Sequence, residues 1–409
     1  MTTFAPESRV AVGHLIVRRE DEDEYVVGDP GTGTFVAVPQ VGARLIELLA
    51  AGRSIEEATE QIEEETGEYI DGIDFVEVLV EAGVLDNRTG PEPPPDRKVK
   101  YWAVSKIPAR FVKPLFGRAA WTFYVFCLAA SFAVFIFEPA LIPSYEDTFF
   151  LPDILVDVLI TNAVVVFFAY VHEIWHGLAG AAAGIPSRLR LERRGIFPVL
   201  ETDLSGLWAL APERRYSPFL AGMAIDSVLL FASLAPRFAW SRGWIDPPPG
   251  LIRFLALMVF TQLARIIFQT LAYLRTDMYL VMTTATGCRN LHQVTRLSLK
   301  RLIRKLPPDE AIILRDADTK DLKVARWYRW LYLAGLAWMV WFAFYYLLPS
   351  TRLVLGWLFS ALSDAPVFSY GWWEAVALAF FTLLSLLLPL AVWLRNRHRE
   401  AREARGATA

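Results

Sequence analysis

The sequence predicts a multi-domain chain: a small α+β domain, then an α-helical polytopic membrane domain of about six transmembrane helices. Hydrophobic residues make up 54% of the 409 residues and aromatic residues 13%, and the mean hydropathy is positive, which is unusual for soluble domains. The charges are also segregated, since acids dominate before the linker and bases cluster beside the apolar segments. We therefore expect a first domain at residues 1–92, a proline-rich and basic linker at 93–118, and a membrane domain at 119–409 with its core at 154–280.

The first domain is expected to contain three strands followed by three helices. The strand-like runs are His14–Arg19, Glu24–Val27 and Thr34–Val38, with a turn at Asp29-Pro30-Gly31. The helical patterns are Val41–Leu49, a helix that begins after Ser54, and Ile73–Val84. Glu57 follows Ser54 by three residues and completes a capping-box pattern. We interpret the acidic run Glu20–Glu24 as a solvated hairpin tip.

Three local features of the sequence indicate where the N-terminus lies, how the two domains are joined and which cysteine-based sites are not expected. Residues 1–13 lack the apolar core of a cleavable signal peptide, so the N-terminus is expected to stay in the cytosol. Pro91–Pro95 is rich in proline and favours an extended spacer. The chain has two cysteines, Cys127 and Cys288, which predict neither a disulfide framework nor a cysteine-based metal site.

The membrane domain is expected to cross the bilayer with segments near the 20 or so residues that a bilayer requires. The predicted spans are Ala119–Phe137, Ile154–Gly177, Pro218–Pro236, Leu251–Tyr273, Leu331–Leu348 and Trp373–Leu394. The apolar run Val354–Leu362 is too short to span and is expected at the outer interface. The loop Glu138–Asp153 has no Lys or Arg, whereas the next loop, the segment Arg275–Arg329 and the tail are rich in bases. The positive-inside rule then places both termini in the cytosol of a multi-pass cell-membrane protein.

The second predicted span contains the sequence His172-Glu173-Ile174-Trp175-His176. Two histidines four residues apart share one face of a helix and can bind one Zn²⁺, with Glu173 beside the open coordination position. A glutamate there can take a proton from metal-bound water. The alternative is that a polar pair packs inside a helix bundle, but ionisable residues at membrane depth are costly and usually functional.

Two histidines require a third protein ligand. The other histidines, His14, His292 and His398, are poorly placed for this role. A carboxylate is the better expectation, and two remain open from the residues alone. Asp277 lies at the cytosolic end of the fourth span, at matching depth, whereas Asp203 lies in the inner loop after the histidine-bearing helix.

Two further charged residues lie inside predicted spans. Asp226 in the third span and Arg265 in the fourth are at similar depth, and charges in mid-membrane usually pair. We expect an Asp226–Arg265 bridge that holds the two spans together, with a structural role outside the active site.

The motif in its membrane helix, with an aspartate two spans later, resembles the site-2-protease family of intramembrane zinc peptidases, and within it the peptide zinc metalloproteases. The matching segments are HEIWHGLAGAAAGIP and TDLSGLWAL. The resemblance implies Zn²⁺ bound by His172, His176 and Asp277, with Glu173 as the catalytic residue. The family's Asn…Pro…Asp-Gly-Tyr run reads here as Gln269, Ala272, Asp277, Met278 and Tyr279. Asp203 and Gln269 become candidate supporting or substrate-binding residues.

The first domain resembles the PqqD-like fold, a winged-helix peptide-recognition domain of ribosomal-peptide maturation systems. The matching segment is GTGTFVAVPQVGARLIELLAAGRSIEEATEQI. The resemblance implies that a leader peptide adds as an extra strand at an exposed sheet edge. A winged-helix module without a peptide ligand is the alternative.

Together these features predict a zinc-dependent endopeptidase that cleaves a peptide at the cytosolic side of the membrane, in ribosomal-peptide maturation or export. The expected partners are a leader-bearing precursor peptide, membrane lipid, and an exporter or peptide-modifying enzyme; no nucleic acid is expected. One alternative is a non-catalytic membrane scaffold that binds a leader peptide for an exporter. A second is a stress-response protease whose first domain senses another signal.

Overall fold

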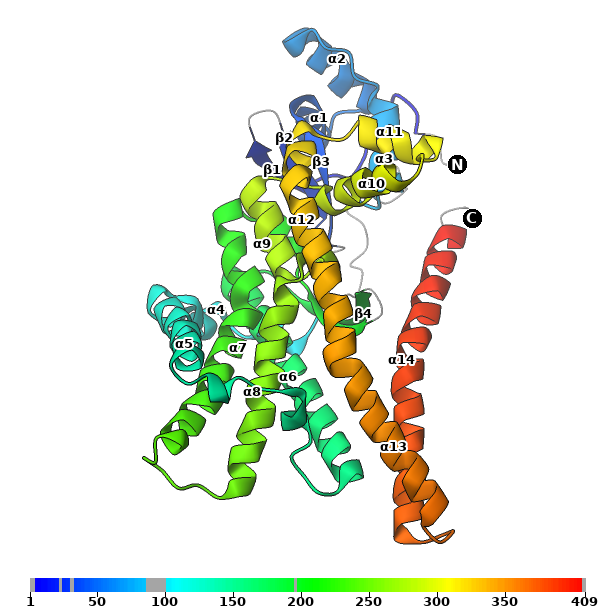
Figure 1. Ribbon diagram of the computed structural model, residues 1–409. Coiled ribbons are helices and arrows are strands. Elements are labelled where there is room, and N and C mark those ends of the chain that lie inside the picture. Colours follow the sequence, from blue (N-terminus) through cyan, green and yellow to red (C-terminus); the bar gives the residue numbers. More distant parts are fainter. Residues whose placement is uncertain (1–3, 22–23, 30–32, 86–100, 195–196, 407–409) are drawn as a thin grey trace.

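The computed structural model describes residues 4–406 except 22–23, 30–32, 86–100 and 195–196. A small N-terminal α+β domain sits at one end of a long helical domain (Figure 1). The predicted turn at residues 29–31 and the proline-rich segment at residues 91–95 fall wholly or partly outside the described residues. The coarse prediction of a small α+β unit followed by a helical domain is confirmed.

The N-terminal domain has the predicted order of strands and helices. Its antiparallel sheet has the order β1-β2-β3, and three helices pack against it. The elements are β1 (Ile16–Asp21), β2 (Glu24–Asp29), β3 (Thr34–Pro39), α1 (Gln40–Ala50), α2 (Ile55–Thr66) and α3 (Gly72–Glu81). The Ser54 side chain accepts a hydrogen bond from the Glu57 N–H while the Glu57 carboxylate accepts one from the Ser54 N–H. This capping box starts α2 at the predicted residue.

Among the described residues, five helical segments are long and apolar enough to cross a membrane. They are α5 (Arg118–Phe137), α6 (Ile154–Ala183), α7 (Pro212–Ser241), α8 (Pro249–Thr270) and the continuous segment Thr319–Asp364. Four of them contain the first, second, third and fifth predicted spans in full, whereas α8 ends three residues before the end of the fourth predicted span, Leu251–Tyr273. The sixth predicted span lies in α14 (Tyr370–Gly406), whose described apolar part, Tyr370–Leu384, is shorter.

The fifth membrane segment differs from its prediction. It comprises α12 (Thr319–Phe342), a π-helical turn η7 (Ala343–Leu347) and α13 (Leu348–Asp364). The run Val354–Leu362 is therefore part of a helix that continues from α12 through η7, and its expected place at the outer interface stays a prediction. Helical backbone bonds continue through the π turn, so the short apolar run needs no independent nucleus.

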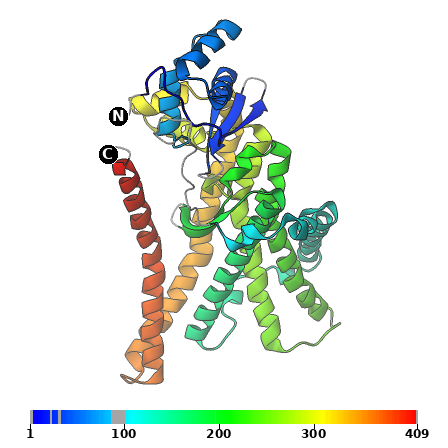
Figure 2. The same ribbon diagram turned by 180° about the vertical axis from the view of Figure 1, so that it is seen from behind.

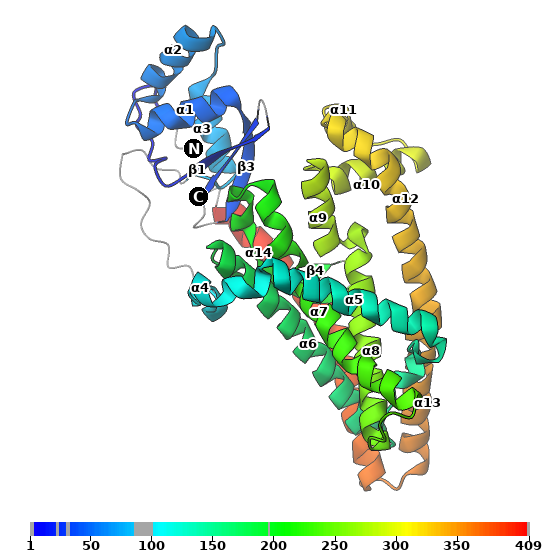
Figure 3. The same cartoon turned by 90° about the vertical axis from the view of Figure 1, so that its left-hand side faces the viewer.

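Shorter elements connect the long helices. They are η1 (Ala103–Lys106), α4 (Ala109–Val112), η2 (Lys113–Phe116), η3 (Pro139–Leu141), η4 (Tyr145–Thr148), β4 (Arg188–Arg194), β5 (Phe197–Asp203), η5 (Ser205–Ala209), η6 (Ala272–Leu274), α9 (Asp277–Thr286), α10 (Leu291–Ile303) and α11 (Pro308–Arg315). Strands β4 and β5 form an antiparallel hairpin between α6 and α7. Figures 2 and 3 show the N-terminal domain, α10, α11 and the C-terminal end of α14 at one end of the helical domain.

The second half of the expected linker packs against the membrane domain. The Trp102 N–H donates to the Ser187 carbonyl at 2.9 Å. A Cβ at Gly177 would come within 3.0 Å of the Trp102 ring, so this glycine of α6 receives the segment before α5. The small residues after the histidine motif thus serve close packing by the chain's own segments.

Candidate metal centre

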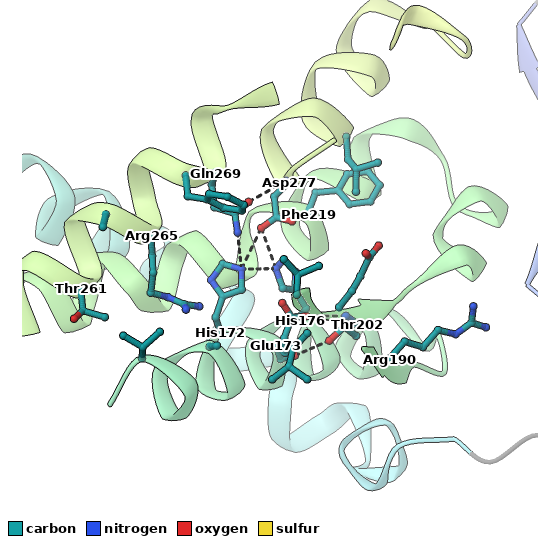
Figure 4. Close-up of a pocket in the computed structure, with 18 of the residues that line it drawn as sticks. His172, Glu173, His176, Arg190, Thr202, Phe219, Thr261, Arg265, Gln269 and Asp277 are labelled. Atoms are coloured by element: carbon teal, nitrogen blue, oxygen red, sulfur yellow. Dashed lines mark hydrogen bonds and ion pairs between the residues drawn. The ribbon is translucent and has the colours of Figure 1, made fainter. Parts of the chain in front are cut away.

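Helix α6 places His172, Glu173 and His176 on a buried face in its C-terminal half. All three side chains are buried, and one ligand atom from each lies within 4.8 Å of the others. Figure 4 shows the two imidazole rings pointing toward the same space, with Glu173 beside them. The four-residue spacing brings the rings to one helix face, and the cluster could hold a metal ion.

Asp277 completes the convergence of ligand atoms. His172 Nε2 and His176 Nε2 lie 3.1 Å apart. Asp277 Oδ2 lies 3.2 Å from the first and 3.1 Å from the second. The structure thus brings Asp277, from the start of α9, to the two histidines. Three atoms of the N,N,O type preferred by zinc face one point.

The turn before Asp277 has a residue other than glycine in a left-handed conformation, and Met278 follows Asp277 where the resembled family has glycine. Arg275 adopts a left-handed conformation with φ of 58°, a region uncommon for residues other than glycine. Gln269 holds the turn from both sides: its carbonyl accepts from the Thr276 hydroxyl at 2.6 Å, and its side-chain oxygen accepts from the Asp277 N–H at 3.2 Å. Gln269 Nε2 also lies 3.1 Å from His172 Nε2. Gln269 therefore positions both Asp277 and His172.

Helix α7 orients both histidine rings through their other nitrogens. His172 Nδ1 lies 2.7 Å from the Asp226 carboxylate, and His176 Nδ1 lies 2.8 Å from the Pro218 carbonyl. An imidazole that donates from Nδ1 presents Nε2 as an acceptor or metal ligand. The two rings are thus turned so that both Nε2 atoms face Asp277.

Asp226 belongs to this site, so its exclusion from the active site was wrong. The expected ion pair is present, with Arg265 Nε 3.4 Å from Asp226 Oδ1. The other carboxylate oxygen, however, contacts His172. The similar depth of Asp226 and Arg265 in their predicted spans indicated that they would pair. The sequence of α7 does not indicate that the His172 ring of α6 would contact Asp226.

Gly222 lets α7 approach the histidines closely. A Cβ at this position would lie 2.3 Å from His172 Nε2 and 2.5 Å from His176 Nε2. Such distances are far below van der Waals contact, so only glycine fits between the two rings. Pro218, Gly222 and Asp226 recur every four residues and define the face of α7 that meets the metal centre.

Glu173 is held by strand β5. Its carboxylate accepts a hydrogen bond from the Thr202 N–H at 2.7 Å, and its carbonyl accepts one from the Thr202 hydroxyl at 3.1 Å. The hairpin β4–β5 therefore fixes the glutamate beside the metal centre. Sequence reasoning missed Thr202, because a backbone donor carries no residue-specific signal.

Asp203 does not join the histidines in any described contact. Its carboxylate forms an ion pair with Arg190 of the neighbouring strand at 2.7 Å and accepts from the Ser205 hydroxyl at 2.5 Å. Asp203 also lines the cavity that opens from the metal centre. This placement favours Asp277 as the third ligand.

A cavity of about 760 Å³ opens from the metal centre. Its polar lining includes the metal cluster, Arg190, Asp203, Arg265 and Gln269. Apolar and aromatic residues of α8, α12 and η7 also line the cavity, namely Phe260, Trp338, Met339, Phe342 and Tyr346. An extended chain with an apolar segment matches this combination of surfaces.

The described residues thus define a helical domain with membrane-spanning character, a small α+β domain, and a buried cluster able to hold a metal ion. Comparison of the chain with protein-family models, with curated proteins and with solved structures found no match.

Proposed function

We propose that this protein is a zinc-dependent endopeptidase that cleaves a peptide at the membrane, on the cytosolic side. The observation that carries the proposal is the convergence of His172 Nε2, His176 Nε2 and Asp277 Oδ2, with all pairwise distances between 3.1 and 3.2 Å. Glu173, the fourth member of the cluster, points into the same cavity.

The donor atoms fit zinc in number, type and spacing. Bonds of about 2.0–2.1 Å at tetrahedral angles would separate donor atoms by roughly 3.4 Å. The observed separations are slightly shorter, so a small outward shift of the three groups would accommodate the ion. Three protein ligands leave the fourth position open, as in catalytic rather than structural zinc sites.

The protein's own residues would then perform distinct tasks. Bound zinc supplies a polarising charge and lowers the pKa of a water molecule. Glu173 takes a proton from the attacking water and delivers it to the leaving amine. Asp226 and the Pro218 carbonyl keep the imidazole rings oriented, and Gln269 keeps Asp277 in place.

The substrate is a peptide that passes an extended, partly apolar segment through the cavity. The aromatic residues of α12 would contact the apolar side chains of the peptide. The part of the cavity beside His172, His176 and Asp277 would hold the scissile bond. A leader-bearing precursor peptide is the substrate that the resemblance of the N-terminal domain favours. Delivery to an exporter or to a modifying enzyme belongs to the same proposal.

Glu173→Gln is the test of this proposal. The amide retains the shape and can keep its contact with Thr202, but it cannot act as the proton acceptor. We expect zinc content near that of the unaltered protein and a loss of about 10²–10⁴-fold in peptide cleavage. Glu213→Gln, an exposed position at the start of α7, is the matched control. Cleavage that is unaffected by Glu173→Gln would contradict the role of Glu173, whereas a zinc-loaded unaltered protein that cleaves no peptide would support the scaffold.

A further inference from the structure

We propose that the N-terminal domain is a structural support of the metal centre, and that Glu20 and Arg215 are the positioning residues that connect them. The connection runs along one face of α7. This inference rests on the proposed function only for the identity of the metal. The contacts themselves involve the chain's own residues.

The first step is a buried ion pair between the two domains. Arg215 is 1% exposed, and its two terminal nitrogens donate to the two oxygens of Glu20 at 2.8 and 2.7 Å. Such fork-shaped pairing fixes orientation as well as distance. The interpretation of the acidic run as a solvated hairpin tip is therefore wrong at Glu20, whose side chain is 19% exposed. Glu24 forms an ion pair with Arg289 and is 33% exposed, and residues 22–23 lie outside the described residues.

The second step connects this pair to the cavity wall. The Arg215 guanidinium lies 4.9 Å from the centre of the Trp208 ring and donates to the Trp208 carbonyl at 3.2 Å. Arg18 of β1 donates to the same carbonyl at 3.3 Å. Trp208 lines the cavity beside Phe219, with ring centres 6.5 Å apart. Arg18 of β1 and Arg215 of α7 thus both contact Trp208, a residue that lines the cavity.

The third step connects Arg215 to the histidines. Residues at intervals of three and four share a face of a helix, and Arg215, Pro218, Gly222 and Asp226 follow this spacing. Pro218 orients His176, Gly222 touches both rings, and Asp226 orients His172. Helix α7 continues across Pro218 from Pro212 to Ser241, so we infer that a shift at Arg215 is transmitted along the helix to these three contacts.

This arrangement differs from a tethered recruitment domain. A tether raises the local concentration of substrate and leaves the chemistry unchanged. A docked domain that fixes α7 also affects metal retention. The N-terminal domain is therefore a site of control: a ligand that alters the position of β1 alters the metal centre.

The test uses full-length protein in detergent and compares Glu20→Gln, Arg215→Gln and the double variant. Zinc release to a chelator and amide exchange along residues 212–226 are measured. Glu65→Gln is the matched control, because Glu65 forms a similar forked pair with Arg44 at 3.0 and 2.9 Å, on the outer face of the same domain.

We expect Glu20→Gln to speed zinc release by up to about tenfold, less than the 10–100-fold typical of a residue that contacts a metal ligand directly. Exchange should increase as far as Gly222–Asp226. The double variant should be milder than Arg215→Gln plus Glu20→Gln combined, since neither charge is left without its partner. Glu20→Asp, which keeps the charge, should give an intermediate rate and covers the case in which Glu20→Gln fails to fold.

Zinc release in Glu20→Gln equal to that in Glu65→Gln would overturn the inference, as would faster exchange that stops before Pro218. Protein that binds no zinc at all would refute the proposed function instead. Exchange at Gly222–Asp226 would then still decide whether the N-terminal domain supports α7.

Discussion

Helices α7 and α12 form two walls of the same cavity, and they differ in how they are fixed. In the most apolar stretch of α7, 61% of the residues are buried, against 6% for α12–α13. Helix α7 packs against α5, α6, α8 and α9 and offers polar contacts to the histidines. Helix α12 offers aromatic side chains and leaves most of its surface exposed. We therefore expect the geometry of the metal site to depend on α7, the buried wall. The shape of the cavity beside its aromatic lining should depend on α12, the exposed wall.

The largest effect is expected at Asp277, the candidate ligand that completes the site whose histidines α7 orients. Asp277→Ala should abolish stoichiometric zinc binding and peptide cleavage, because two histidines alone cannot hold the ion in a catalytic geometry. Asp203→Ala should retain zinc, because Asp203 contacts Arg190 instead of the histidines. Metal analysis of both purified variants checks this. The reverse result would transfer the ligand role to Asp203.

Substitutions at two glycines, one on α7 and one on α12, distinguish the roles of the two helices. Gly222→Ala would force a methyl group within 2.5 Å of both Nε2 atoms, whereas Gly335→Ala on α12 would press at 2.5 Å on the Tyr273 ring, which has no described contact with His172, His176 or Asp277. Both substitutions overpack the interior, which costs about 1–3 kcal/mol of stability. Only Gly222→Ala should also lower zinc affinity by tenfold or more, by analogy with other supporting contacts of metal ligands. Equal zinc affinity in the two variants would show that α7 does not set the metal geometry.

The exposed wall should affect substrate affinity more than chemistry. Phe342→Ala removes an aromatic ring that lines the cavity and stacks on Trp338, with ring centres 5.2 Å apart. We expect KM for an apolar peptide to rise roughly tenfold, or about 1.4 kcal/mol, with kcat and zinc content little changed. Phe344→Ala, whose ring is 68% exposed on the same segment, is the control. A fall in kcat without a change in KM would place Phe342 in the chemistry.

The sequence was most informative where signals are local. The spacing of His172 and His176, the length of the apolar runs and the capping box at Ser54 depend on neighbouring residues. The contacts missed from the sequence are long-range. Asp226 lies 54 residues from His172, and Glu20 lies 195 residues from Arg215.

The missed contacts share a physical cause. The depth of Asp226 indicated a charged partner but not that its second oxygen would face a histidine ring. The acidic run of β1 looked solvated because a buried arginine at the start of a membrane helix has no periodic pattern. Backbone groups such as the Pro218 carbonyl and the Thr202 N–H are identical in every residue type, so only the fold selects them.

The smallest predicted effect concerns the surroundings of α9, the helix that begins with Asp277 and packs against α7. His292 of α10 packs beside the rings of Tyr279 and Tyr332, with ring centres 6.3 and 5.8 Å away. Burial, with the nearby charges of Arg275 and Arg296, lowers the pKa of His292 to about 4. The folded protein therefore keeps this ring neutral at pH values where an unfolded chain, with an ordinary histidine pKa near 6.5, takes up a proton.

Stability is then fully present above about pH 6.5 and falls as the pH decreases toward 4, because only the unfolded state binds the proton in that window. His292→Gln should remove this contribution, so the difference in Tm between the two proteins should shrink or change sign between pH 7 and pH 4.5. Thermal unfolding in detergent at several pH values measures it. Parallel Tm curves for both proteins would mean that His292 is solvated. Zinc affinity at pH 7 should be similar in both, since His292 has no described contact with His172, His176 or Asp277, whereas α7 contacts the histidines directly.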